Sequence, residues 1–416
     1  MSTGRNAPLE VVMVTNNVLA DKIGGHERYV SSLSRALVAG GASVRVIAKR
    51  WQHDAQAREV ESDGVLVERY AVPSKLNPLY AALYPLYVAA GVGARVRRGA
   101  GANTVVHAHM SVPAFPLAFR RAPYLFTFHA PIWRELLMER QNSYALPGAL
   151  QQTVVRVARG LERRVARRAS AVTVLSEFMR EELGVLDDGV AARAALIPGG
   201  VDGERFAPPT VPRPVAAAEP VLFTARRLTP RTGVDELLRA LPLIRTSRPG
   251  TRLVVAGAGP MDGPLRGLAR AIGVERAVDF LGRISDDELV AWYRRATLVV
   301  VPTRELEGFG LSTAEALACG AAVVGTPAGA TPELLRALDP GLLSDDCSAA
   351  ALARTIVRLL GDPDRIVAIR GGARARVLPQ MAWPRVADRY LELYERVAFT
   401  ADSNRSHRAS LRSALP

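Results

Sequence analysis

The sequence predicts an α/β protein built from two domains with doubly wound parallel sheets, and three observations support this prediction. The chain has 416 residues, which exceeds the length at which a single hydrophobic core stops growing. Apolar, strand-like runs alternate with helix-like segments over residues 9–48 and again from Val221 onward. Residues 298–333 read as a further strand–loop–helix–strand unit. We therefore expect two sheets, each covered by helices.

The first domain is expected to span residues 1–207. It opens with a strand at residues 9–15, a loop ending in Gly24 and Gly25, a helix over 25–39 and a strand at 44–48. Further short apolar runs predict strands at residues 105–109, 124–128 and 171–175.

The second domain is expected to span residues 221–382. Five prolines among alanines mark residues 208–220 as the linker that precedes it. Residues 383–397 have the pattern of a last amphipathic helix. The polar and basic residues 398–416 are expected to form a disordered tail.

The composition limits the class of protein. The formal net charge of +14 favours acidic partners, such as nucleotide phosphates, anionic lipid or nucleic acid, without choosing among them. Cys319 and Cys347 are the only cysteines, so no disulfide framework is implied and a cytoplasmic location is expected. Neither a signal peptide nor a transmembrane helix is indicated by the sequence.

The most informative stretch is residues 298–333. A buried strand at residues 298–301 leads to a loop that contains Glu307, Gly308, Phe309 and Gly310. Ser312 and Glu315 follow with the spacing of a capping box at a helix start. Glycines let backbone N–H groups approach a ligand, and a helix N-terminus favours an anion. Taken separately, Glu315 reads as a helix cap and Glu307 as a solvated loop residue.

The whole stretch resembles the donor-site signature of retaining glycosyltransferases of family 4. The matching form is E-G-F-G-L-x3-E-A-x-A-x-G-x2-V-V-G-T-P, in which seven residues separate Glu307 from Glu315. The resemblance covers roughly residues 9–397 and implies the GT-B fold, in which two Rossmann-like domains face each other across a cleft. It also implies that the helix at 383–397 crosses back to the first domain.

The resemblance implies transfer of a sugar from a nucleoside-diphosphate sugar, carrying UDP or GDP, to an acceptor hydroxyl. His129, in T-F-H-A, matches the catalytic histidine; Glu307 would hold the donor sugar, Glu315 the ribose and Arg227 the diphosphate. That family usually has Lys where this chain has Thr232, so Arg231 or Arg226 is left to supply the second positive charge. The other donor-binding residues implied are Gly24, Gly25, Gly233, Gly257, Gly259, Arg283, Ile284, Gly308, Phe309, Gly310, Leu311 and Ser312.

We expect no metal and no cofactor. The arginines and the helix dipole would neutralise a leaving diphosphate without a bound cation. His107 and His109 form an H-x-H pattern, but no carboxylate or cysteine cluster nearby completes a metal site. Asp362 and Asp364 form a D-x-D pattern in a polar turn far from any glycine loop.

Residues 150–169 predict a helix with two faces. Val154, Val157, Leu161 and Val165 form an apolar stripe, and the arginines between Arg156 and Arg168 form a basic one. The basic face is either a solvated surface or a contact with an anionic membrane. A membrane contact would suit a lipid-linked acceptor, whereas a solvated face would suit a glycan or small-molecule acceptor.

Three alternatives to a transferase remain open from the sequence. A nucleotide-sugar epimerase of the same fold needs no acceptor. A nucleic-acid-binding protein would suit the basic charge, but the chain lacks a basic–aromatic recognition motif. A Rossmann oxidoreductase is disfavoured because Asp262 stands at the third glycine position of the G-x-G-x-x-G pattern that starts at Gly257.

Overall fold

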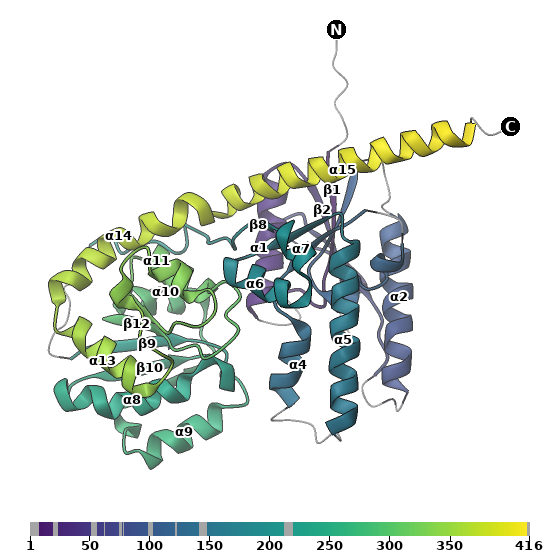
Figure 1. Ribbon diagram of the computed structural model, residues 1–416. Coiled ribbons are helices and arrows are strands. Elements are labelled where there is room, and N and C mark those ends of the chain that lie inside the picture. Colours follow the sequence, from purple (N-terminus) through teal and green to yellow (C-terminus); the bar gives the residue numbers. More distant parts are fainter. Residues whose placement is uncertain are drawn as a thin grey trace, which may run out of the picture. The chain divides into compact units, whose positions relative to one another are not determined.

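The computed structural model describes residues 8–19, 24–50, 56–61, 63–74, 77, 79–98, 103–120, 123–140, 148–211 and 219–413. The chain divides into two compact units (Figure 1). Unit 1 comprises Met1–Pro198 together with Trp383–Pro416, and unit 2 comprises Gly199–Ala382. Each unit contains its own sheet with helices on both faces, so we describe the two separately.

The described strands of unit 1 form one sheet in the order β3-β4-β2-β1-β5-β6-β7-β8, parallel except for β3. The central strands are buried apolar runs, such as Val11–Val14 in β1, because helices cover both faces of a parallel sheet. The strands are β1 (Glu10–Val14), β2 (Ser43–Lys49), β3 (Arg58–Val60), β4 (Leu66–Tyr70), β5 (Thr104–Ala108), β6 (Leu125–Phe128), β7 (Ala171–Val174) and β8 (Ala195–Leu196).

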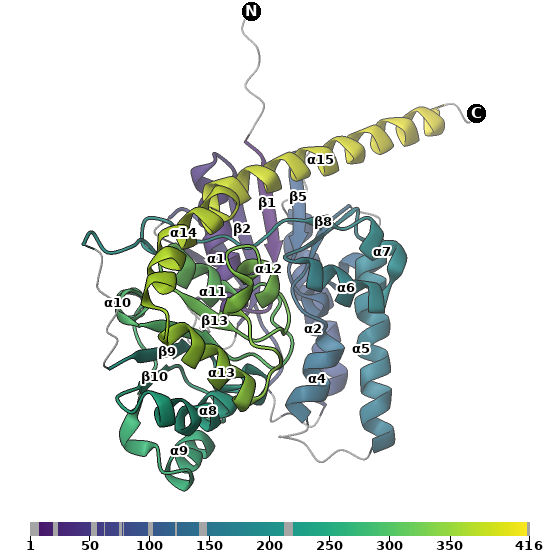
Figure 2. The same cartoon turned by 60° about the vertical axis from the view of Figure 1, so that its left-hand side comes forward.

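The helices of unit 1 include the last one of the chain, which packs along α1 (Figure 1). Figures 1 and 2 both show α4 and α5 side by side. The helices are α1 (Gly25–Ala39), α2 (Tyr80–Arg98), α3 (Ser111–Ala114), η1 (Leu117–Phe119), α4 (Ile132–Arg140), α5 (Gly148–Arg168), α6 (Glu177–Leu186), α7 (Asp188–Ala192) and α15 (Trp383–Ser413).

Unit 2 has an all-parallel sheet in the order β11-β10-β9-β12-β13. Figure 1 shows α8 and α9 on one side of this sheet and α11 and α14 on the other. The strands are β9 (Val221–Ala225), β10 (Arg252–Ala256), β11 (Val278–Gly282), β12 (Leu298–Val301) and β13 (Val323–Gly325). The helices are η2 (Pro230–Thr232), α8 (Val234–Ser247), α9 (Asp262–Ala271), η3 (Glu275–Ala277), α10 (Asp286–Arg295), α11 (Leu311–Ala318), α12 (Thr331–Leu335), η4 (Pro340–Leu342), α13 (Ala349–Leu360) and α14 (Pro363–Met381).

The strand orders locate the point in each sheet where a ligand is expected. In unit 2, β10 and β12 flank β9, so the chain reverses its direction of winding there. In unit 1, β2 and β5 flank β1 in the same way. Open α/β sheets bind ligands outside the carboxyl ends of the strands at this switch point. The loops that follow β9 and β12, and those that follow β1 and β5, are therefore the places to look.

Two boundaries differ from those expected from the sequence. The units divide at Pro198 and Gly199, not at the proline-rich segment, of which residues 212–218 lie outside the described residues. Residues 199–207 belong to unit 2 because Arg374 donates to the carbonyls of Gly203 and Phe206, each at 2.8 Å. In place of the disordered tail expected at 398–416, α15 continues to Ser413, and no glycine or proline between residues 398 and 413 stops it; residues 414–416 lie outside the described residues.

Gly257 provides a test of the backbone packing behind the loop that follows β9. Its φ is +130°, and a Cβ there would lie 1.8 Å from the carbonyl oxygen of Arg226. We expect Gly257→Ala to lower the free energy of unfolding by about 3 kcal/mol or more, measured by urea denaturation. Gly267 on α9 is the matched control, because a Cβ there meets nothing within 4 Å. Gly267→Ala should raise stability by about 0.5–1 kcal/mol; equal effects of the two changes would contradict the packing described.

Candidate active site

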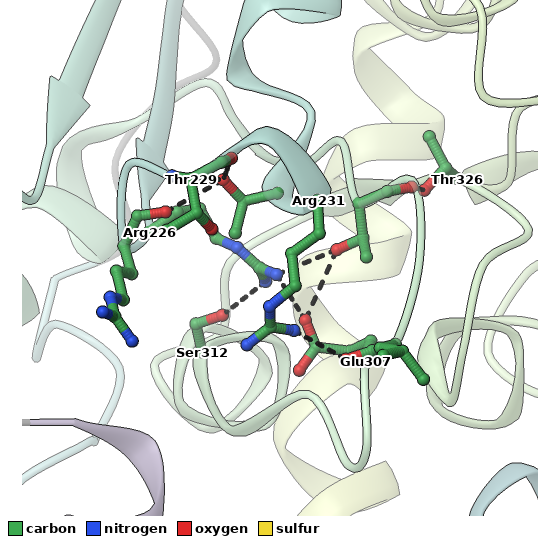
Figure 3. Close-up of polar contacts among 10 residues, drawn as sticks. Arg226, Thr229, Arg231, Glu307, Ser312 and Thr326 are labelled. Atoms are coloured by element: carbon green, nitrogen blue, oxygen red, sulfur yellow. Dashed lines mark hydrogen bonds and ion pairs between the residues drawn. The ribbon is translucent and has the colours of Figure 1, made fainter. Parts of the chain in front are cut away.

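A buried ion pair joins the loops that follow β9 and β12 in unit 2 (Figure 3). The guanidinium of Arg226 donates through Nη2 to the carboxylate of Glu307 and, at 2.9 Å, to Oγ1 of Thr303. Its Nη1 donates to Oγ of Ser312 at 3.2 Å. Only 7% of the Arg226 side chain and 15% of the Glu307 side chain are exposed. We call these four residues, together with Arg231, the Arg226 cluster.

The Arg226 cluster keeps Glu307 ionised. Burial by itself would raise the pKa of Glu307, but the charge and hydrogen bonds of Arg226 outweigh it, aided by the charge of Arg231 and a bond from Thr303. The net result is a pKa below the ordinary value, so Glu307 is a carboxylate at neutral pH. A buried carboxylate needs such partners, because an unpaired charge in the interior is costly.

The loop that carries Glu307 is held in a strained conformation. Leu306 has a φ of 52° and is the only non-glycine residue with a positive φ in the described part of the chain. Nη1 of Arg231 donates to its carbonyl at 2.7 Å, which helps to fix the turn. On the other side, a Cβ at Gly329 would lie 2.6 Å from the backbone of Glu307, so only glycine allows this approach. Strain of this kind is commonly found at functional sites.

Three of the glycines that were expected to bind the donor allow the backbones of neighbouring loops to pack closely. A Cβ at Gly257 or Gly259 would lie 1.8 Å or 2.2 Å from the carbonyls of Arg226 and Leu228, respectively. Gly233 has a φ of +69° and would place a Cβ 1.8 Å from the carbonyl of Pro302. These contacts bring the loops after β9, β10 and β12 together, and the position of the Arg226 side chain follows from them.

The start of α11 differs from the capping box expected from the sequence. The N-cap is Gly310, in the left-handed region, and no side chain caps the helix. Ser312 is the second helical residue, and its hydroxyl accepts from Arg226 instead. The prediction was wrong by two residues, because a glycine able to adopt a left-handed conformation begins the helix earlier.

The Arg226 cluster is suited to an anion. Two arginines and the N-terminal end of α11 face one carboxylate, which leaves an excess of positive potential. A guanidinium has five N–H donors, and three of those of Arg226 are used by Glu307, Thr303 and Ser312. Its remaining two N–H groups have no partner among the residues that the structure describes, which leaves them for an anion at the helix N-terminus.

Arg227 and Thr232 do not join the cluster. The Arg227 side chain is exposed and has no polar partner among the residues that the structure describes. Thr232 is buried, and its hydroxyl donates to the carbonyls of Arg227 at 2.9 Å and Thr229 at 2.7 Å. Thr232 therefore stabilises the loop, and the positive charge of the cluster comes from Arg226 and Arg231.

The other expected donor-binding residues lie around the same end of the sheet. Glu315 is buried on α11, and Arg283 and Ile284 follow β11 with the arginine exposed. Phe309 is buried, and a Cβ at Gly199 would lie 2.6 Å from its ring. Gly308 and Leu311 flank Phe309 and Gly310 in the loop and the first turn of α11.

The expected catalytic histidine lies in unit 1 in a group of imidazole rings. His129 follows β6, and His109 follows β5. Nδ1 of His109 and Nε2 of His129 are 3.2 Å apart. His26, the second residue of α1, packs edge-on against His129 with ring centroids 4.7 Å apart, and Tyr29 does so at 4.9 Å. Burial lowers the pKa of His109 and His129, so both rings are neutral at pH 7.

The loop after β1 also contributes to the site of unit 1. Nδ2 of Asn17 donates to the carboxylate of buried Glu27 at 3.0 Å, and Nε2 of His26 lies 2.9 Å from Oγ1 of Thr15. Gly24 is the N-cap of α1, and a Cβ there would lie 2.4 Å from Glu27. Gly25, where a Cβ meets nothing within 4 Å, begins the helix.

A polar network behind the histidines connects α15 to the sheet. His107 lies 2.7 Å from both Oη of Tyr394 and Oγ1 of Thr127. Oη of Tyr390 lies 2.8 Å from Oη of Tyr29 and 3.2 Å from Oγ1 of Thr173. The H-x-H pattern therefore has structural partners, and the described residues contain no group of three side chains able to hold a metal.

The sequence missed several residues of the two sites. Thr303, Gly329, His26 and His109 were not expected there. A signal for Gly329 exists in the small-residue loop after β13, and the H-x-H pattern is a signal for His109. Thr303 had no signal of its own, since only the fold turns its hydroxyl toward Arg226.

The basic helix α5 is less uniform than its sequence suggests. Arg163 and Arg167 both pair with Asp187, and their hydrogen bonds lower the pKa of Asp187 to about 2 although burial acts to raise it. Arg164 lies over the ring of Phe119, 4.2 Å from its centroid. Val157, which belongs to the apolar stripe, is 66% exposed, because the first half of α5 extends beyond the sheet (Figure 2). No helix in the described ranges is long and apolar enough to cross a membrane.

Comparison with known families identifies the class of protein. The model described as glycosyl transferases group 1 matches residues 212–376, and that of Glycosyltransferase Family 4 matches residues 23–205. Solved structures show the same fold: sucrose-phosphate synthase from Thermosynechococcus elongatus has a TM-score of 0.77 at 22% identity, covering 94% of this chain and 100% of that one. Anabaena HepE in complex with UDP and glucose has a TM-score of 0.72 at 20% identity, covering 93% of this chain and 99% of that one.

The chain belongs to glycosyltransferase family 4, and the predicted GT-B fold is confirmed. D-inositol 3-phosphate glycosyltransferase of Acidothermus cellulolyticus is 30% identical over 396 residues, 89% of this chain and 85% of that protein. A GDP-mannose-dependent alpha-(1-6)-phosphatidylinositol monomannoside mannosyltransferase of Mycobacterium tuberculosis is 35% identical over 247 residues, 56% of this chain. The match spans only 63% of that mannosyltransferase. These relatives are transferases, so the epimerase alternative has no support.

Proposed function

We propose that the protein is a retaining glycosyltransferase that moves a sugar from a nucleoside-diphosphate sugar to an acceptor hydroxyl. The observation that carries this proposal is the Arg226 cluster, an excess of positive charge at the N-terminus of α11 and at the switch point of the sheet. The names of the relatives, which include GDP-mannose-dependent enzymes, support it, as does the UDP bound by HepE. UDP and GDP are the two nucleotides to be tested first.

The chemical problem is heterolysis of the bond between the anomeric carbon and the diphosphate. Negative charge grows on the leaving diphosphate, and preorganised donors aimed at it lower the barrier. The free N–H groups of Arg226, the backbone amides of the first turn of α11 and the charge of Arg231 would supply this stabilisation. Glu307 would accept from hydroxyls of the donor sugar, and Glu315 from the ribose. Retention means that the acceptor attacks from the face that the diphosphate leaves.

The assignment of the diphosphate contact to Arg226 departs from the sequence, which favoured Arg227. The reason is geometric, since Arg226 turns into the cluster and Arg227 turns to solvent. His129 in unit 1 would contact the reacting sugar, and Gly24 and Gly25 would leave room near it. No metal or cofactor is required by this scheme, because the positive charges named above act on the diphosphate.

For the acceptor, we propose a lipid-linked molecule reached at an anionic membrane surface through one face of unit 1. Phe119, 63% exposed, lies under Arg164, and exposed Val157 and Arg168 lie on the same side of α5. Exposed apolar side chains among arginines suit a peripheral contact with lipid head groups. The mannosyltransferase relative is named for a phosphatidylinositol acceptor, whereas the inositol 3-phosphate relative is named for a water-soluble one.

A panel of nucleotide sugars tests the reaction class. The protein is incubated with UDP- and GDP-sugars, with and without candidate acceptors, and free nucleoside diphosphate is measured. Release that depends on an acceptor, with the α-configured sugar retained in the product, is the expected result. Release of an epimerised nucleotide sugar, or no turnover with any donor, would contradict the proposal.

The diphosphate assignment is tested by three variants at two neighbouring positions. Arg226→Ala should weaken nucleoside-diphosphate binding by about 1.5–3 kcal/mol, because it removes charge-assisted hydrogen bonds, and Arg226→Lys should lie between it and wild type. Arg227→Ala is the matched control, with an expected change of less than about 0.5 kcal/mol. Affinities come from titration calorimetry and folding from circular dichroism. A loss confined to Arg227→Ala would return the role to Arg227.

Metal independence is tested by chelation. Turnover in excess EDTA should equal that in magnesium, because arginines and helix amides stabilise the leaving group. Asp362 caps α14, where it accepts from the backbone of Arg365, so it has a structural role already. Activity that vanishes in EDTA and returns with magnesium or manganese would overturn this part of the scheme.

The membrane contact is tested by sedimentation with phosphatidylglycerol vesicles. Pelleting at low salt should fall at moderate salt and should be lost in the variant R164Q/R168Q, since each basic residue near the surface contributes about 1 kcal/mol. The control R163Q/R167Q removes two arginines already paired with Asp187 and should still pellet. Absence of pelleting by wild type at low salt would favour a soluble acceptor.

A further inference from the structure

The hydrogen bond between His109 and His129 restricts where the protons of these rings can be. It joins Nδ1 of His109 to Nε2 of His129 over 3.2 Å, with ring planes inclined by 36°. Burial lowers the pKa of both rings, so each is neutral and carries one proton on one of its two nitrogens. A single proton lies between them, and either ring can provide it. The choice decides which nitrogen of His129 is left for a ligand.

The surroundings of His109 decide between the two arrangements. Its other nitrogen, Nε2, is buried and has no hydrogen-bond partner among the described residues. The ring of His107, tilted by 39° with its centroid 3.9 Å away, already uses both nitrogens for Tyr394 and Thr127. A buried N–H without an acceptor is less well tolerated than a bare acceptor nitrogen. The proton of His109 is therefore on Nδ1, where it has an acceptor, and His109 donates to Nε2 of His129.

We propose that His109 is a positioning residue that fixes His129 in the Nδ1-protonated tautomer, so that His129 offers an N–H donor to its ligand. The proton of His129 must be on Nδ1, because Nε2 accepts from His109. Nδ1 of His129 has no protein partner within the described ranges, and the residue is partly exposed. His129 then acts as a hydrogen-bond donor to a sugar or phosphate oxygen and does not abstract a proton. The identity of this ligand depends on the proposed function, whereas the assignment of the tautomer does not.

The neighbouring rings keep His129 in this orientation. Tyr29 and His26 meet it edge-on, with interplanar angles of 79° and 88°. Tyr29 is in turn held by Tyr390 of α15 through their hydroxyl groups, 2.8 Å apart. Rotation of the His129 ring would break the bond to His109 and disturb both edge contacts. One tautomer and one orientation are thus specified together.

The tautomer is measured directly by long-range ¹H–¹⁵N correlation spectroscopy of the full protein labelled with ¹⁵N-histidine, near pH 8 and without substrate. The signals of His129 are assigned as those that disappear in His129→Gln. The expected pattern has a protonated Nδ1 and an unprotonated Nε2 for His129, and the same pattern for His109. Protonated Nε2 on His129 would overturn the proposal, whatever the enzyme activity, so this result is separable from failure of the proposed function.

Variants of His109 connect the tautomer to the reaction. His109→Asn keeps an amide N–H near the position of Nδ1 and should preserve the His129 pattern, whereas His109→Leu removes the donor and should shift His129 toward protonated Nε2. Loss of the correct tautomer should lower kcat about tenfold to a hundredfold with little change in KM. Tyr29→Phe is the control, because it retains the ring beside His129 and should leave the tautomer unchanged. A His129 pattern that is the same in His109→Leu as in wild type would contradict the positioning role.

Discussion

The ion pair between Arg226 and Glu307 is the constraint on which the site of unit 2 depends. Both side chains are largely buried, and burial of a charge is tolerated only when partners compensate for lost solvation. The partners come from separate loops, and Thr303 and Ser312 complete the set. These loops can meet only because glycines at 233, 257 and 259 leave room for neighbouring carbonyl groups. Backbone packing thus determines where the charge is presented.

The two units present different chemistry at the ends of their sheets. The site of unit 2 carries more positive than negative charge, which suits an anionic leaving group. The site of unit 1 contains neutral imidazoles and hydroxyl groups, with pKa values of His107, His109 and His129 all lowered by burial. Neutral donors suit sugar hydroxyls, because they form directional hydrogen bonds without favouring a free ion. Within unit 1, α15 belongs to the same network through Tyr390 and Tyr394.

The sequence was sufficient for the fold and for the loops that carry the Arg226 cluster, because strand runs, glycines and the Glu307–Glu315 spacing are local signals. It could not show which of Arg226 and Arg227 pairs with Glu307, since adjacent residues in an extended segment point in opposite directions and only the fold determines which one turns inward. The same limit applies to Thr303, whose role depends on a partner 77 positions away in the chain. The sequence also does not reveal that Val157 is exposed, because that depends on how far α5 extends beyond the sheet that would cover its apolar side.

The most direct test of the central claim is calorimetric titration of the wild-type protein with UDP, GDP, ADP and TDP in turn. If the Arg226 cluster is the diphosphate site of a sugar donor, one of these nucleotides should bind saturably with one site per chain, and inorganic diphosphate should compete with it. If none of the four binds at millimolar concentration to the folded protein, or if binding is unaffected by competing diphosphate, the cluster is not the site proposed.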